Sequence, residues 1–233
     1  MELRHTATLF ESGLRWLDYY LREDRGVPAG IIKGSMTELS GPPLAGKTQL
    51  SLQLIAAAQR EGLPCGLVVT EEFDKYRAFE LGVNLETLLV ADPLNGEQAF
   101  EATSAFLHHG CKFIVFDSLA AAQPQVCREG WKGQEDQDRL FANAFRVLAP
   151  LFHTSDAALF ATNQLRHTPT EAAVRSGVHS AGSRVVDPIF DERWTLEKQR
   201  DGDRVAYTLT TIKSRWRTSD RVVGFNGNLG NAF

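Results

Sequence analysis

The chain has 233 residues, of which 43% are hydrophobic and 23% are charged, and its formal net charge is −4. This length suits one α/β domain with a large core, and no apolar run approaches the length of a membrane span. The acidic balance argues against a protein coated in nucleic acid, although it permits a local basic groove. The first residues lack the apolar stretch of a signal peptide, and the three cysteines lack metal-ligand spacing. We therefore expect a cytoplasmic protein, or a nuclear one in a eukaryote.

Residues 1–34 are predicted to form an N-terminal segment, and residues 35–233 a single core domain. A short helix around Leu14–Leu21 is broken by the run Gly26-Val27-Pro28-Ala29-Gly30. In the core, apolar stretches of strand length alternate with amphipathic stretches of helical length. Strands are expected at 36–39, 65–70, 88–90, 113–116 and 157–162, and helices after Lys47 and at 73–81, 97–108 and 134–153.

The pattern predicts an α/β fold whose central sheet is mostly parallel. Strands such as 113–116 are apolar on both faces, which is typical of a parallel sheet covered by helices on both sides. Beyond residue 185 the pattern predicts strands only, at 189–197, 204–213 and 221–225, with a hairpin turn at 200–203. We expect these last strands to be antiparallel.

A glycine-rich loop follows the first core strand and precedes a helix. It reads G-x-x-x-x-G-K-T, the phosphate-loop (Walker A) pattern, and comprises Gly41, Pro42, Pro43, Leu44, Ala45, Gly46, Lys47 and Thr48, followed by Gln49. Positive φ angles at Gly41 and Gly46 would turn successive N–H groups toward a polyphosphate. Lys47 would then reach the β- and γ-phosphates, and the Thr48 hydroxyl would ligate Mg²⁺. The sequence thus predicts an ATP and magnesium site.

Polar residues at the ends of later strands complete the predicted site. Asp117 follows an apolar strand and is the expected magnesium carboxylate, although a helix cap is the alternative. Glu71 and Glu72 follow the strand that ends at Thr70; at least one of them is expected to activate water, with Glu71 slightly favoured, and a helix N-terminus is the alternative. Gln164 ends the next strand and would sense the γ-phosphate, unless it is simply a polar strand end.

Two segments, 123–134 and 165–184, lack periodicity. Both follow the carboxyl ends of predicted strands, which is the edge where open α/β sheets bind ligands. The second segment is long for a loop in a compact domain, and loops of that length are usually functional or disordered.

Together these residues resemble the RecA/RadA recombinase superfamily over nearly the whole chain. The resemblance rests on the loop 41–50, on Leu81–Leu89 followed by Asn95–Ala99, on Val115–Ala121 and on Thr162–Arg166. It implies a RecA-like P-loop core with DNA-dependent ATPase activity in recombination or repair. It also implies that Tyr76 packs against adenine and that Lys213 and Arg215 act in trans at a neighbour's ATP site.

The same resemblance places segments 123–134 and 165–184 at the two loops that hold single-stranded DNA in that superfamily. Cations and one aromatic residue in these loops would contact phosphates and bases. The candidate DNA-binding residues are Arg128, Trp131, Lys132, Arg166, His167, Arg175, His179 and Arg184.

The chain departs from full recombinases in two respects. We expect no further DNA-binding domain beside the core, and residues 1–34 do not contain the Phe-x-x-Ala tether of RadA-type proteins. We therefore expect a minimal recombinase paralogue or accessory that binds single-stranded DNA and either a recombinase subunit or itself. A KaiC-like or DnaB-like ring-forming ATPase and an ATP-binding adaptor with weak hydrolysis are the alternatives.

Overall fold

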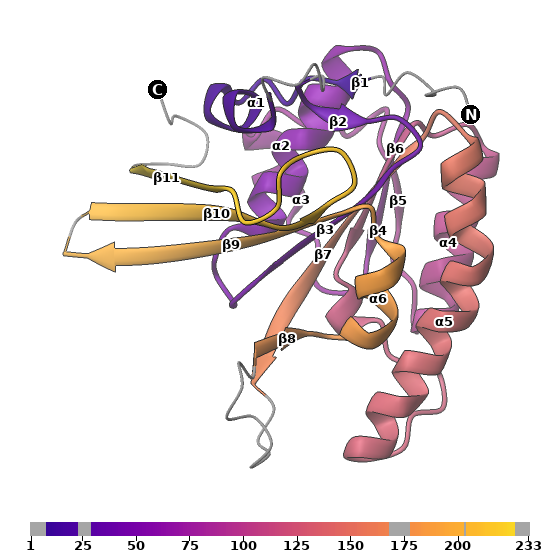
Figure 1. Ribbon diagram of the computed structural model, residues 1–233. Coiled ribbons are helices and arrows are strands. Elements are labelled where there is room, and N and C mark those ends of the chain that lie inside the picture. Colours follow the sequence, from indigo (N-terminus) through magenta and orange to yellow (C-terminus); the bar gives the residue numbers. More distant parts are fainter. Residues whose placement is uncertain (1–7, 23–28, 168–177, 203, 227–233) are drawn as a thin grey trace, which may run out of the picture.

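The computed structural model describes residues 8–22, 29–167, 178–202 and 204–226 (Figure 1). Its strands are β1 Thr8–Phe10, β2 Ile31–Ile32, β3 Met36–Gly41, β4 Cys65–Val69, β5 Leu89–Ala91, β6 Phe113–Asp117, β7 Ala158–His167, β8 Val178–Ser180, β9 Glu192–Asp201, β10 Arg204–Ser214 and β11 Val222–Asn226. Its helices are α1 Arg15–Leu21, α2 Lys47–Arg60, α3 Lys75–Glu80, α4 Gly96–His108, α5 Trp131–Thr154 and α6 Ser183–Ile189, with a 3₁₀ turn η1 at Leu119–Ala121.

One large sheet forms the centre of the fold, with strand order β11-β10-β9-β3-β7-β6-β4-β5. The strands from β9 to β5 pair in parallel, whereas β10 and β11 pair antiparallel beyond β9. Figure 1 shows the hairpin of β9 and β10 projecting away from the helices. The predicted α/β fold, a mostly parallel sheet with antiparallel strands at its C-terminal end, is confirmed. This arrangement agrees with the core that the sequence resemblance implies.

The central strands are buried on both faces, as their continuous apolar sequence predicts. In β6, Phe113 and Val115 face one hydrophobic cluster, whereas Ile114 and Phe116 face the other. Helices α1, α2 and α3 contribute to the first cluster, and α4, α5 and α6 to the second. Burying each large apolar side chain contributes about 1.5–3 kcal/mol to stability. The two-sided core therefore holds the strands in their order and keeps their carboxyl ends together at one edge.

The N-terminal segment packs against the core. Trp16 and Leu17 of α1 are buried in the first hydrophobic cluster. The guanidinium of Arg217 donates to the backbone oxygens of Leu21 (2.9 Å) and Gly30 (2.8 Å), and it forms a buried ion pair with Glu192. These bonds attach both sides of the break after α1 to the C-terminal part of the sheet.

Regular structure extends into both segments that the sequence left aperiodic. Strand β7 continues to His167 and pairs antiparallel with β8, so the two ends of segment 165–184 form a ribbon. Helix α5 begins at Trp131, which shortens the first segment.

The expectation that only strands follow residue 185 is wrong. Helix α6 spans Ser183–Ile189, and β9 begins at Glu192. Val186 and Phe190, four residues apart, are both buried in the second cluster and hold this helix against the sheet. Pro188 near the end of so short a helix conceals its helical pattern in the sequence.

Candidate phosphate-binding site

The glycine loop connects β3 to α2 at the carboxyl edge of the sheet. Gly46 has φ 97°, in the left-handed region, and precedes the first helical residue, Lys47. Gly41 does not take the positive φ that the sequence suggested, because it is the last residue of β3. Glycine is needed there for a different reason, since a Cβ at Gly41 would lie 2.3 Å from the backbone oxygen of Leu196. Leu44, with φ 62°, supplies the other left-handed turn of the loop.

Lys47 folds back over this loop. Its ammonium donates to the backbone oxygens of Gly41 and Pro42, both at 2.9 Å. Burial lowers the pKa of Lys47, and the nearby carboxylates of Asp117 and Glu71 oppose that shift. The ammonium therefore lies inside the loop's concavity, where it would meet a polyanion.

Asp117 lies at the end of β6, beside the start of α2. Its carboxylate accepts hydrogen bonds from the hydroxyls of Thr162 and Thr48. Burial raises the pKa of Asp117, and both hydroxyls partly oppose this shift. A positive ion in contact with Asp117 would favour its charged form.

Thr48 and Asp117 fit the ligand preferences of Mg²⁺. Both supply hard oxygen atoms, and Mg²⁺ is usually held by one or two carboxylates together with substrate phosphates and water. In the described ranges, no group of three or more His, Cys, Asp or Glu residues could hold a metal ion. A metal site built on Asp117 would thus rely on Thr48 and on the phosphates for its other ligands.

Glu71 and Gln164 meet at the same edge. The Glu71 Oε1 atom accepts hydrogen bonds from Ser118 Oγ (2.7 Å) and from Gln164 Nε2 (3.2 Å). A single cavity is lined by Pro43, Leu44, Gly46, Lys47, Thr48, Gln49, Glu71, Asp117, Ser118, Gln164, Lys198 and Tyr207. Most of the predicted phosphate, magnesium and water-activating residues therefore share one cavity.

Glu72 lies elsewhere. It lines a neighbouring cavity together with Phe73, Lys75 and Asp92, and it is absent from the lining of the phosphate-loop cavity. Glu71 also lines this second cavity, so the Glu71 side chain stands between the two.

Tyr76, the predicted adenine contact, belongs to α3, and 73% of its surface is exposed. It does not line the phosphate-loop cavity. Arg77, the next residue of α3, donates to the Gln49 side chain (3.4 Å), so α3 lies beside the first turn of α2.

Lys198 and Tyr207 are lining residues that the sequence did not single out. They come from β9 and β10, and the Lys198 ammonium lies 5.6 Å from the centre of the Tyr207 ring. In the sequence, only the alternation along β9 hints at Lys198, because it places Lys198 on the same face as the buried Leu196. The alternation does not reveal that β9 pairs with β3 and so lies beside the glycine loop.

The candidate DNA-binding residues are distributed around the two predicted loops. Arg128 is held by Asp136 through two hydrogen bonds of 2.6 and 2.8 Å, which lower the pKa of Asp136 to about 2. Arg184 is exposed on α6, near Asp138 of α5. Burial raises the pKa of Asp138, and the charge of Arg184 partly opposes that rise. Lys132 is exposed in the first turn of α5, which begins at Trp131.

The other members of this set lie on the ribbon. Arg166 and His167 belong to β7 and His179 to β8, whereas Arg175 lies outside the described residues.

Lys213 and Arg215 contact their own chain. The Lys213 ammonium donates to the backbone oxygens of Asp187 (2.7 Å) and Phe190 (2.6 Å) at the end of α6. Arg215 forms an ion pair of 2.8 Å with the buried Asp191, although 62% of its side chain stays exposed. In this conformation both cations stabilise the turn between α6 and β9.

The fold and the site together define a class of α/β protein in which a glycine loop and strand-end carboxylates share the carboxyl edge of a parallel sheet. Within that class, the chain belongs to the RecA family, because residues 11–174 match the model of the RecA N-terminal domain.

Curated relatives agree with this assignment. The chain is 40% identical over 142 residues to Protein RecA of Helicobacter hepaticus, and 38% over 143 residues to Protein RecA of Caulobacter sp. K31. It is 41% identical over 142 residues to the mitochondrial DNA repair protein recA homolog of Dictyostelium discoideum. Each match covers 59% of this chain but only 31–41% of the relative. The chain thus spans less than half the length of these relatives.

No helix in the described part of the chain is both long and apolar enough to traverse a bilayer.

Proposed function

We propose that this protein binds ATP with Mg²⁺ and hydrolyses it in response to single-stranded DNA, as a RecA-type recombination or repair protein. The observation that carries the proposal is the convergence of Lys47, Thr48, Glu71, Asp117 and Gln164 on one cavity at the phosphate loop. In its biological role the protein would assist a recombinase, through a recombinase subunit or through self-association. The relatives that bear the names RecA and DNA repair protein support this direction.

Each residue has a distinct part in the proposed hydrolysis. Backbone N–H groups of the loop and the Lys47 ammonium hold the β- and γ-phosphates. Glu71 orients a water molecule and takes its proton while the water oxygen bonds to the γ-phosphorus. The bond from the γ-phosphorus to the bridging oxygen breaks, which leaves ADP and inorganic phosphate. Mg²⁺, held through Thr48 and Asp117, would neutralise charge on the phosphates.

Gln164 links this chemistry to DNA. Its amide donates to the same Glu71 oxygen that Ser118 contacts, and its backbone oxygen accepts from Ala181 N (3.2 Å) at the end of β8. A shift of Gln164 toward a γ-phosphate would therefore move both Glu71 and the ribbon β7–β8. The cations in segments 123–134 and 165–184 are the proposed contacts for the DNA backbone.

The test is the steady-state rate of ATP hydrolysis with and without single-stranded DNA, over a range of salt concentrations. We expect stimulation by DNA that weakens steeply with salt, because phosphate contacts release counterions. Lys47→Ala should abolish nucleotide binding. A rate unchanged by DNA, together with no DNA binding at low salt, would remove the DNA part of the proposal and leave the ATPase part.

A further inference from the structure

Arg193, on β9, is the centre of a buried polar cluster beneath the phosphate-loop edge. Its Nε donates to Glu38 Oε2 (2.6 Å), and its Nη2 donates to Ser180 Oγ (3.2 Å). Its Nη1 forms an ion pair with Asp187 Oδ1 (2.7 Å). Only 12% of the Arg193 side chain is exposed. One guanidinium therefore joins strand β3, the end of β8 and helix α6.

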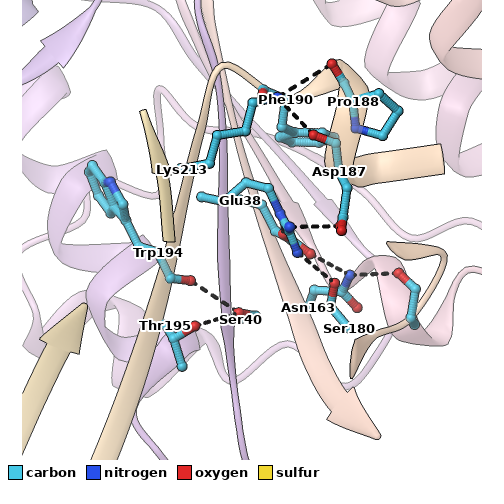
Figure 2. Close-up of polar contacts among 12 residues, drawn as sticks. Glu38, Ser40, Asn163, Ser180, Asp187, Pro188, Phe190, Trp194, Thr195 and Lys213 are labelled. Atoms are coloured by element: carbon cyan, nitrogen blue, oxygen red, sulfur yellow. Dashed lines mark hydrogen bonds and ion pairs between the residues drawn. The ribbon is translucent and has the colours of Figure 1, made fainter. Parts of the chain in front are cut away.

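Glu38 carries these contacts toward the site. It is fully buried on β3, three residues before Gly41, and its Oε1 atom accepts from Asn163 Nδ2 (2.7 Å). Figure 2 shows Glu38 beside Asn163, with Asp187 of α6 on the other side of the cluster. The Glu38 carboxylate is thus shared between Arg193 and Asn163.

Asn163 uses both ends of its amide. Its Nδ2 also donates to Ala181 O (2.8 Å), at the end of β8, and its Oδ1 accepts from the backbone N–H of Gln164 (2.9 Å). Asn163 is fully buried, so no solvent replaces these partners. Its orientation therefore fixes the backbone at Gln164 and the distance between β7 and β8.

Buried charges specify geometry. An ion pair withdrawn from water persists only if its atoms are paired in good geometry, and removing one partner leaves a charge without solvation. The Glu38–Arg193 pair therefore constrains Asn163 more tightly than packing alone would, because the amide has one arrangement that satisfies Glu38, Ala181 and Gln164 together.

We propose that Glu38 and Arg193 are a positioning pair that couples the nucleotide site to the ribbon β7–β8. The pair holds Asn163, Asn163 holds Gln164, and Gln164 contacts Glu71 at one end and Ala181 at the other. Arg193 also contacts Ser180 directly, so both strands of the ribbon are linked through this pair to β3. This inference rests on the proposed function, since it concerns how ATP and DNA binding influence each other.

The experiment measures coupling rather than activity alone. The affinity for a fluorescein-labelled oligothymidine is determined by anisotropy with and without a non-hydrolysable ATP analogue and Mg²⁺. Nucleotide should tighten DNA binding to the wild type by about tenfold. In Arg193→Lys and Glu38→Gln the ratio should fall below about threefold, while the affinity for the nucleotide alone changes little. Both substitutions retain polar groups of similar size, so the proposal does not depend on a drastic variant that fails to fold.

The control is a second buried ion pair, between Glu192 of β9 and Arg217, which lies against the N-terminal segment. Arg217→Lys should lower the melting temperature as Arg193→Lys does but leave the coupling ratio unchanged. Equal ratios in the wild type and the Arg193 variant would overturn the positioning pair alone. Loss of coupling in the Arg217 variant as well would overturn it too, since general destabilisation would then explain the result. A wild type that binds no DNA overturns the proposed DNA function together with this inference, whereas a wild type that binds DNA equally well with and without nucleotide overturns this inference alone.

Discussion

Glu71 and Glu72 are adjacent in the sequence but have different surroundings. Glu71 accepts hydrogen bonds from Ser118 and Gln164 at the phosphate-loop cavity, whereas Glu72 lines the neighbouring cavity and not that one. A base that abstracts a proton from water must lie within hydrogen-bond reach of that water. Glu71 lines the same cavity as Lys47, which is where the proposed function puts the γ-phosphate and its attacking water.

Glu71→Gln should therefore lower kcat for ATP hydrolysis about 10²–10⁴-fold, because the amide cannot accept the proton. The dissociation constant for nucleotide should stay within about threefold, since the amide retains the hydrogen bonds to Ser118 and Gln164. Glu72→Gln is the matched control and should retain most of the rate. The measurements are steady-state hydrolysis and nucleotide titration. Equal losses in the two variants would contradict the assignment of Glu71.

Gly41 shows how the elements around the loop depend on close backbone approach. Strands β3 and β9 run parallel side by side, with Ser40 opposite Thr195. One residue further along, Gly41 lies against the backbone of Leu196. A methyl group there would lie 2.3 Å from a backbone oxygen, which cannot turn away as a flexible side chain would. One of the two strands would have to move.

We expect Gly41→Ala to lower the free energy of unfolding by about 1–3 kcal/mol. It should also weaken ATP binding, because the Gly41 carbonyl that Lys47 contacts would shift with the strand. Chemical denaturation and nucleotide titration measure the two effects. Gly224→Ala on β11 is the control, because the nearest atom to a Cβ there is 3.9 Å away. Equal, small effects at both positions would contradict this prediction, because they would show that β9 can move away from a Cβ at residue 41 at little cost.

The sequence predicted the elements that have a clear apolar pattern, and it missed the features that depend on a weak pattern or on which strands pair. Strands such as β6 were found because their residues are apolar up to the last one, Asp117, and the glycine loop because its spacing is dictated by phosphate geometry. Helix α6 was missed because seven residues with an internal proline show little helical period. Lys198 was missed because its place beside the loop depends on strand order, which no local pattern encodes.

Lys213 and Arg215 raise a question about the whole molecule. The predicted role in trans needs both cations at a neighbour's γ-phosphate, yet Lys213 donates to the carbonyls that end α6 and Arg215 pairs with Asp191. Burial lowers the pKa of Lys213, as expected for an ammonium partly withdrawn from water. For the role in trans, Lys213 would have to leave these carbonyls, and Arg215 would have to leave Asp191, when a neighbouring chain binds. The two cations would then contact the neighbour's γ-phosphate only in the assembled state.

A mixing experiment tests the role in trans. Lys47→Ala inactivates a chain's own phosphate site but leaves its basic pair, whereas the double variant Lys213→Gln/Arg215→Gln has the opposite defect. Each alone should be inactive in hydrolysis. In an equal mixture, random assembly pairs an intact site with an intact basic pair at about one site in four, so about a quarter of the wild-type rate should return.

The glutamine side chains keep donors for the α6 carbonyls, so melting temperatures near that of the wild type would show that the turn after α6 survives. A mixture as inactive as its components would contradict the role in trans. Lys213 and Arg215 would then serve only to stabilise the turn between α6 and β9. Recovery would instead show that each site is completed by a second chain, because neither variant holds both halves of the machinery.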